Sequence, residues 1–132
     1  MKTYQEYQTD LDLDPKNPYL WLAYTQALSR QPDLTVETVI AVNKTMECLA
    51  ECRRDKWWYE EFVELYGILG TCYARRGWFE RAHDKITEGL CVRPDFYPFW
   101  LLRANVSAAR AERDMENYRT EKALVEKGME GA

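Results

Sequence analysis

Helix-breaking residues occur at only a few places in this chain, and the segments between them carry apolar residues three and four positions apart. The breakers that separate these segments are Pro15, Pro18, Pro32, Gly77, Pro94, Pro98 and Gly128. Such spacing places apolar side chains on one face of an α-helix, whereas a half-buried strand alternates every second residue. No segment of the sequence shows a convincing alternation, so the chain is predicted to be all-α.

Length and composition indicate one folded domain that spans residues 1–132. The chain has 132 residues, of which 46% are hydrophobic and 30% are charged. This balance supplies enough apolar surface for a core and is too apolar for a disordered chain. Five tryptophans and nine tyrosines add large aromatic area, which proteins use both in cores and at interfaces.

The charge and the apolar runs argue against two classes of partner. The formal net charge is -4, whereas a nucleic-acid-binding protein needs a clustered basic face. The longest apolar runs, such as 99–102, stop far short of the roughly 20 residues of a membrane span. No basic-then-apolar signal opens the chain. We therefore expect no nucleic acid and no membrane as partners, and a cytoplasmic location.

The segment Asp55-Lys-Trp-Trp-Tyr places two tryptophans at the start of a predicted helix over 57–76. Asp55 can accept the free amide hydrogens of that helix, and the arginine pair at 75–76 complements its negative end. Trp58 falls on the apolar face and is predicted to lie in the core. Trp57 points about 100° away, so it is predicted to contact a partner or cover a neighbouring helix.

Two short segments repeat one arrangement of proline and tryptophan. They are Pro15-Lys-Asn-Pro-Tyr-Leu-Trp21 and Pro94-Asp-Phe-Tyr-Pro-Phe-Trp100. In each, a proline precedes a tryptophan by six positions, and a second proline stands where its missing amide hydrogen costs nothing at a helix start. The two segments indicate an internal repeat.

The stretch 63–96 carries a longer pattern in which each position has a mechanical role. Its members are Tyr66, Leu69, Gly70, Tyr73, Gly77, Phe79, Ala82, Ile86 and Pro94. Gly70 and Ala82 allow two helices to approach closely. Gly77 permits the turn between them, and Pro94 starts the exit to the next pair. The pattern resembles the tetratricopeptide repeat across one full unit, which implies antiparallel helix pairs stacked as a short right-handed solenoid.

The resemblance divides the chain into three units, expected at about 14–56, 57–96 and 97–132. The outer two match less well than the central one. The first aromatic positions of the first and second units, Trp21 and Tyr66, are 45 residues apart, against about 34 in the family. The insertion between them is therefore predicted to lengthen helices.

The last unit has no breaker between Pro98 and Gly128, and its apolar residues keep the three-four spacing. These residues are Leu101, Ala104, Ala108, Ala111, Met115, Tyr118 and Val125. We expect either one long helix or two helices bent near Asp114, with a charged C-terminal half that caps the stack. A short helix in the first dozen residues would close the other end.

By resemblance to tetratricopeptide domains, the first helices of the three units would line a concave surface that binds a ligand. The first unit would contribute Tyr19, Leu22, Gln26, Ser29 and Arg30, the second Glu64, Gly67, Thr71, Ala74 and Arg75, and the third Leu101, Asn105 and Ala108. Small side chains would form the floor, and Arg30 and Arg75 would face an acidic ligand group. Trp57 and the turn residue Trp78 are two further indoles predicted to contact a partner.

No arrangement of side chains in the sequence predicts catalysis. His83 is the only histidine and has no charge-relay partner one helical turn away. A glycine-rich phosphate loop is absent from the sequence. The four cysteines, at positions 48, 52, 72 and 91, lack the tight spacing of a structural zinc site and are interpreted as packing thiols. We therefore expect no enzyme activity, no cofactor and no metal.

These observations favour a noncatalytic protein–protein interaction module, an adaptor or a partner-specific chaperone that binds a peptide or helix in its concave groove. Two alternatives stay open. The first is a structural subunit of a homo-oligomer or larger complex, in which exposed tryptophans and the C-terminal helix become buried. The second is a cysteine-based metal or redox protein.

Overall fold

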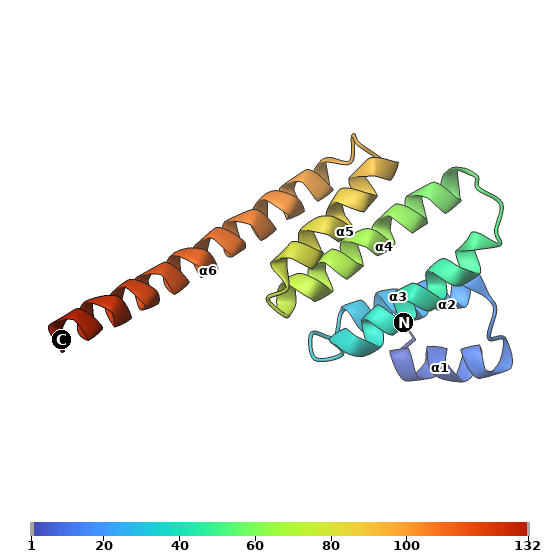
Figure 1. Cartoon of the computed structure of the whole chain (residues 1–132). Helices are drawn as coiled ribbons and strands as arrows, with labels where there is room; N and C mark the ends of the chain where they lie inside the picture. The colour runs from blue at the N-terminus through green and yellow to red at the C-terminus, as the bar shows by residue number, and fades with distance from the viewer. Residues whose placement is uncertain (1, 132) are drawn as a thin grey trace.

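The computed structural model describes residues 2–131, which form six helices and no strand (Figure 1). The helices are α1 (Tyr4–Leu13), α2 (Pro18–Ser29), α3 (Thr35–Ala50), α4 (Lys56–Arg75), α5 (Phe79–Val92) and α6 (Tyr97–Glu130). Each helix packs on the one that follows it in the chain, and α2 also touches α4. The prediction of an all-α fold is confirmed, and α1 forms the expected short helix before the first pair.

Two clusters of buried apolar side chains hold these helices together, and α4 contributes to both. The first cluster joins α2, α3 and α4 through Leu22, Val42, Leu49, Trp58, Leu65 and Leu69. The second joins α4, α5 and α6 through Val63, Ala82, Ile86, Leu90, Phe99 and Val106. Because α4 buries one side in each cluster, it is the central helix of the molecule.

The two adjacent tryptophans at the start of α4 have different environments, as predicted. The Asp55 carboxylate accepts a hydrogen bond from the Trp58 amide at 2.9 Å and so caps the helix. The Trp58 side chain is 3% exposed, and its indole nitrogen donates to the Leu49 carbonyl oxygen at 2.6 Å. Trp57 is only half-buried, and its ring lies 5.0 Å from that of Tyr19 in α2.

Most of the extra length between Trp21 and Tyr66 lies at the start of α4, in the second unit. Ten residues of α4 precede Tyr66, whereas three residues of α6 precede Trp100, the corresponding aromatic. This extension of about two turns contains both Trp57 and Trp58. The insertion lengthens a helix, but that helix is α4 of the second unit and not a helix of the first unit, where the extension was expected. The added turns join the second helix pair to the first.

The repeated proline–tryptophan segments form the same hydrogen bond twice. The indole nitrogen of Trp21 donates to the Pro15 carbonyl oxygen at 2.7 Å, and that of Trp100 donates to the Pro94 carbonyl oxygen at 2.8 Å. Each bond ties the first turn of a helix, α2 or α6, to the loop that enters it. The repeated spacing thus fixes how the chain enters both helices.

The turn and the close approach predicted within the second pair are both present. Gly77 has a backbone φ of 76°, a conformation that residues with a Cβ atom rarely adopt. A Cβ atom on Gly70 would lie 2.6 Å from Cγ1 of Ile86, a side chain that is fully buried. Only a glycine at position 70 lets α4 and α5 approach this closely.

The ring of Phe99 holds α6 against both α4 and α5. A Cβ atom on Gly67 of α4 would lie 2.7 Å from this ring, and one on Gly89 of α5 would lie 2.6 Å from it. The ring therefore fills the space left by two missing side chains, on two different helices. Val106, two turns further along α6, is also buried and extends the contact with α5.

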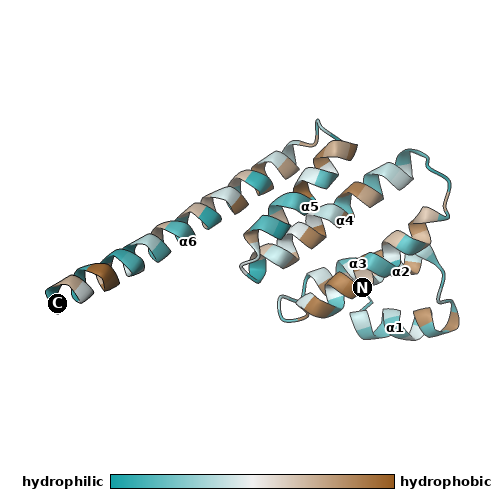
Figure 2. Cartoon of the chain, viewed as in Figure 1, coloured by the Kyte–Doolittle hydropathy of each residue, from teal (hydrophilic) through white to brown (hydrophobic). Residues whose placement is uncertain are grey.

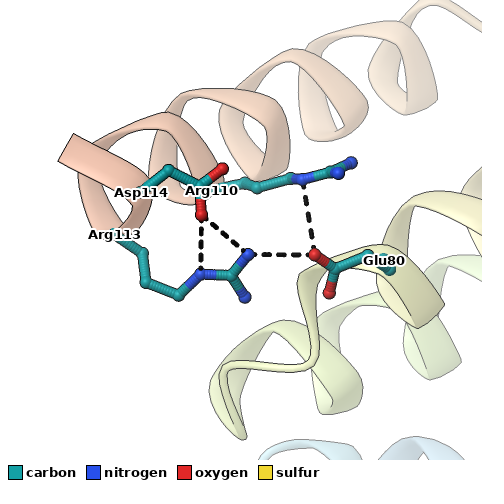
Figure 3. Close-up of polar contacts among 4 residues, drawn as sticks. All are labelled: Glu80, Arg110, Arg113 and Asp114. Atoms are coloured by element: carbon teal, nitrogen blue, oxygen red, sulfur yellow. Dashed lines mark hydrogen bonds and ion pairs between the residues drawn. The ribbon is translucent and has the colours of Figure 1, made fainter. Parts of the chain in front are cut away.

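The last unit is one continuous helix, which settles the question of a bend near Asp114. Close to that residue α6 leaves the rest of the molecule. Arg113 donates to a Glu80 carboxylate oxygen at 2.9 Å, and Arg110 pairs with the same oxygen at 3.4 Å (Figure 3). The hydrogen bond from Arg113 lowers the pKa of the Glu80 carboxyl. Residues 114–131 are all exposed, and α6 projects away from the other helices (Figure 1).

We expect Trp58→Ala to lower the free energy of unfolding by about 3–5 kcal/mol, because it removes a buried indole and opens a cavity. Trp57→Ala, which removes a half-buried indole, should lower it by about 1 kcal/mol. Urea unfolding followed by far-ultraviolet circular dichroism measures both. Equal stability of the two variants would contradict the assignment of Trp58 to the core.

A second pair of variants tests how closely the ring of Phe99 packs against the neighbouring glycine. Gly89→Ala should destabilise the fold by about 1–2 kcal/mol, because overpacking against the ring exceeds the helix-propensity gain of alanine. Gly128→Ala is the matched control, since no atom lies within 4 Å of the added Cβ position, and it should stabilise by about 0.5 kcal/mol. The same change would then have opposite signs at the two sites, and a stabilising Gly89→Ala would rule out the tight fit.

Candidate functional site

An open hollow of about 530 Å³ lies between α4 and the first turns of α6, near the C-terminal end of α2. It is lined by Ser29, Glu64, Gly67, Ile68, Thr71, Cys72, Arg75, Phe96, Pro98, Phe99, Leu101, Leu102 and Asn105. Its volume is within the range of about 300–1,000 Å³ that is usual for ligand pockets.

The structure brings together most of the groove residues predicted from the second and third units. Glu64, Thr71 and Arg75 of α4 lie in the hollow, and Leu101 and Asn105 of α6 face them. On α4 these residues and Gly67 are three or four positions apart, so they share one helical face, whereas Val63 and Leu69 point into the two cores. One face of α4 thus borders the hollow and belongs to neither core.

The aromatic wall of the hollow was missed by the sequence reasoning. Phe96 and Phe99 line it together with Pro98, and Phe99 also covers Gly67. Gly67 lines the hollow as predicted, but the ring of Phe99 packs directly against it. The paired glycines at 67 and 89 are the signal that could have located this ring, since each leaves room for a large neighbour.

The polar residues of the hollow stand at opposite ends of its α4 wall. Glu64 is near one end and Arg75 near the other, about 16 Å apart along the helix at about 1.5 Å per residue. Both side chains are exposed. Arg75 reaches across to the Ser29 carbonyl oxygen with a long hydrogen bond of 3.5 Å, so it links the two helix pairs weakly. The Thr71 hydroxyl donates to the Gly67 carbonyl oxygen at 2.9 Å, so its oxygen can still accept a hydrogen bond.

The acidic end of the hollow continues into a group of carboxylates on α4. Glu61 is half-buried next to Glu64, one turn before it. Burial raises the pKa of the Glu61 carboxyl, and the negative charges of Glu64 and Glu60 raise it further. The charged form of Glu61 is therefore disfavoured in the free protein, and a basic ligand group beside it would relieve the repulsion.

Of the residues predicted from the first unit, only Ser29, at the C-terminal end of α2, lines the hollow. Leu22 is 6% exposed and belongs to the first core cluster, so its prediction as a groove contact is wrong. The α4 extension supplies Trp58 to the same cluster. Gln26 and Arg30 are exposed beyond the hollow, and Tyr19 is exposed beside the ring of Trp57.

Trp78 lies at a second, separate hollow of about 290 Å³. This hollow is lined by Thr35, Val36, Val39, Ile40, Tyr73, Arg76, Trp78 and Arg81. Trp78 is 48% exposed, with the guanidinium of Arg81 5.2 Å from its ring. Its predicted exposure is confirmed, and its predicted role in contacting a partner stays a prediction.

The cysteines are free thiols spread over three helices. Cys48 and Cys52 are half-buried, on α3 and just after its end, Cys72 is buried on α4, and Cys91 is exposed on α5. Burial raises the pKa of the Cys48 and Cys72 thiols. Within residues 2–131, no three His, Cys, Asp or Glu side chains gather in a way that could hold a metal ion.

Two further findings bear on the class of protein. In the part of the chain that the structure describes, no helix combines the length and the apolar character needed to cross a bilayer. Comparison with protein-family models, with curated proteins and with solved structures finds no match. The tetratricopeptide resemblance therefore rests on the residue pattern alone.

The raised pKa of Glu61 gives a pH-dependent prediction. Above its folded-state pKa the ionised carboxylate costs the folded state free energy, whereas below the ordinary value of 4.5 the group is protonated in both states. Glu61→Gln should thus raise the free energy of unfolding at pH 7, and this gain should shrink as the pH falls through the folded-state pKa toward 4.5 and be absent at lower pH. Urea unfolding at several pH values measures this, and a variant less stable than wild type at pH 7 would contradict it.

Proposed function

We propose that this chain is a noncatalytic protein-interaction module that holds a helix or an extended peptide of another protein in the hollow between α4 and α6. The observation that carries the proposal is the arrangement of this hollow, with an apolar wall from α6 and opposite charges at the two ends of the α4 wall. Burial of apolar side chains would supply affinity, and the charges would fix the direction of the guest.

The finer fold assignment, a short right-handed stack of tetratricopeptide-like units, belongs to this proposal. It is supported by the turn at Gly77 and by the close approach of α4 and α5 at Gly70. It is also supported by the equivalent indole hydrogen bonds of Trp21 and Trp100 at the starts of α2 and α6. In such a stack the first helix of each pair faces the concave side, where α4 and α6 border the hollow. The resemblance implies an adaptor or a partner-specific chaperone, which we place in the cytoplasm.

The dimensions of the hollow limit what it can hold. Glu64 and Arg75 are about 16 Å apart, a span of about five residues of an extended peptide at about 3.3 Å each, or about three turns of a helix. The fitting segment has an apolar centre against Phe99 and Leu101. It carries a basic residue at the Glu64 end and an acidic residue at the Arg75 end.

Charge reversal at one end of the hollow tests this function. Arg75→Glu should weaken binding of the guest protein by about tenfold to a hundredfold, because a charge-assisted hydrogen bond is replaced by repulsion. Arg76→Glu is the matched control, since it makes the same charge change at the same end of α4 but at a residue that lines the second hollow. Guests are captured from a lysate on wild-type protein, identified by mass spectrometry and then titrated by calorimetry against each variant.

The outcome is judged together with the thermal melts of the three proteins. Wild-type affinity for Arg76→Glu and reduced affinity for Arg75→Glu, with unchanged melts, would support the assignment. Equal affinities of both variants would exclude the hollow as the binding site. If Arg75→Glu bound the guest less tightly but was also partly unfolded, the result would also count against the hollow as the binding site.

A further inference from the structure

The half of α6 that projects from the molecule exposes large apolar side chains to solvent. Met115, Tyr118, Val125 and Met129 are each at least 50% exposed. Figure 2 shows apolar positions recurring between polar ones along this part of the helix. All residues of 114–131 are exposed, so no other helix of the chain covers these side chains. An exposed apolar stripe on a long helix marks a contact surface.

The exposed apolar residues belong to a heptad seam that runs along the whole of α6. The seam steps by three and four through Leu101, Ala104, Ala108, Ala111, Met115, Tyr118, Lys122, Val125 and Met129, and each of these residues is exposed. Phe99, Val106 and Arg113, spaced by seven, face α5 from the opposite side of the helix. An apolar repeat of this kind, sustained for four heptads, is typical of a coiled-coil contact.

The sizes of the seam residues differ between its two halves. Ala104, Ala108 and Ala111 make the N-terminal half shallow, whereas Met115, Tyr118, Val125 and Met129 make the C-terminal half bulky. A second copy laid parallel would place alanine on alanine and leave gaps in that half. A second copy laid antiparallel would place each bulky half against a shallow one, which is the better packing.

The charges of α6 divide in the same way. Residues 97–111 contain two arginines and no carboxylate, whereas residues 112–130 contain six carboxylates and four basic residues. Antiparallel pairing brings the positive half of one helix against the negative half of the other. Parallel pairing brings together halves of like charge. Size and charge therefore both make the seam complementary to itself in one orientation.

We infer that two copies of this chain associate through an antiparallel pair of α6 helices related by a two-fold axis. In the register that matches sizes, Met115 lies against Tyr118 of the second copy, Ala108 against Val125, and Ala104 against Met129. Ala111 meets the aliphatic stem of Lys122, the single charged residue of the seam, and such a residue fixes register in coiled coils. Both copies use the same surface, so the assembly stops at a dimer.

In this register one flank of the paired seams brings opposite charges together, and the other brings two carboxylates together beside an arginine. Glu112 faces Arg119 of the second copy on one flank, twice per dimer by symmetry. Asp114 and Glu121 face each other on the opposite flank, where Arg113 of the same chain already pairs with Asp114 at 3.1 Å. Of the seam residues only Leu101 also lines the hollow, so the dimer contact does not depend on the proposed binding function.

Sedimentation velocity over a range of concentrations tests the dimer. Wild-type protein should approach twice the 15.7 kDa mass of one chain. The double variant Val125→Glu, Met129→Glu should sediment as a monomer with a folded core, because both positions are exposed in one chain. The double variant Thr120→Glu, Ala123→Glu adds the same charges off the seam and should remain a dimer.

The orientation of the helices is tested by mixing two charge variants. Glu112→Arg and Arg119→Glu should each weaken self-association by about tenfold. In a dimer of either variant, the residue at position 112 of each chain faces a residue of the same charge at position 119 of the other chain. An equimolar mixture should recover dimers. In an antiparallel mixed dimer, the charge introduced at position 112 of one chain faces the opposite charge introduced at position 119 of the other, and the two unchanged residues also face each other. Failure of the mixture to recover dimers would exclude this orientation.

Two other results would overturn the inference. A wild-type chain that stays at 15.7 kDa at every concentration would exclude a second copy as the occupant of the seam. A dimer that persists in the Val125→Glu, Met129→Glu variant would place the interface elsewhere on the molecule.

Discussion

The aromatic ring of Phe99 determines how α6 sits on the rest of the molecule. Its ring occupies space that side chains at Gly67 and Gly89 would fill, so it contacts α4 and α5 at the same time. Because α6 is one continuous helix, this contact near its start also sets the direction in which its far end points. The wall of the hollow and the exposed seam both depend on it. A glycine pair on two helices thus matters more to this architecture than any single polar contact.

Three faces of α6 have three different roles as a result. The face with Phe99, Val106 and Arg113 rests on α5 and on Glu80. A second face completes the hollow with α4 through Leu102 and Asn105. The third carries the heptad seam, whose projecting half meets no other helix of the chain. The proposed guest and the inferred second copy therefore approach α6 from different sides, and the molecule can serve as a binding module while it is also a subunit of a dimer.

Features that depend on neighbours in sequence were predictable, and those that depend on distant contacts were not. The cap of Asp55 and the burial of Trp58 follow from helix geometry, so both could be read from one segment. Leu22 is buried in a cluster that includes Trp58 of the α4 extension, more than thirty residues later in the chain. Phe99 meets glycines on two other helices, and no local pattern encodes such a contact. The sequence did not decide whether α6 is one helix or two, because a segment without a helix breaker can be either straight or bent.

The projecting half of α6 has no tertiary contact to stabilise it. This lack of support suggests a reason for the apolar residues of its seam. Residues 114–130 are only about as long as the shortest helices that are stable alone in water, so their helical state rests on intrinsic propensity and on pairs such as Glu116 with Arg119. A solvent-facing helix that needed only solubility would carry polar residues on every side. Apolar side chains at heptad spacing are useful to such a helix only if another helix covers them. Pairing with a second copy would add the missing packing, and helix formation in this segment would then be coupled to protein concentration.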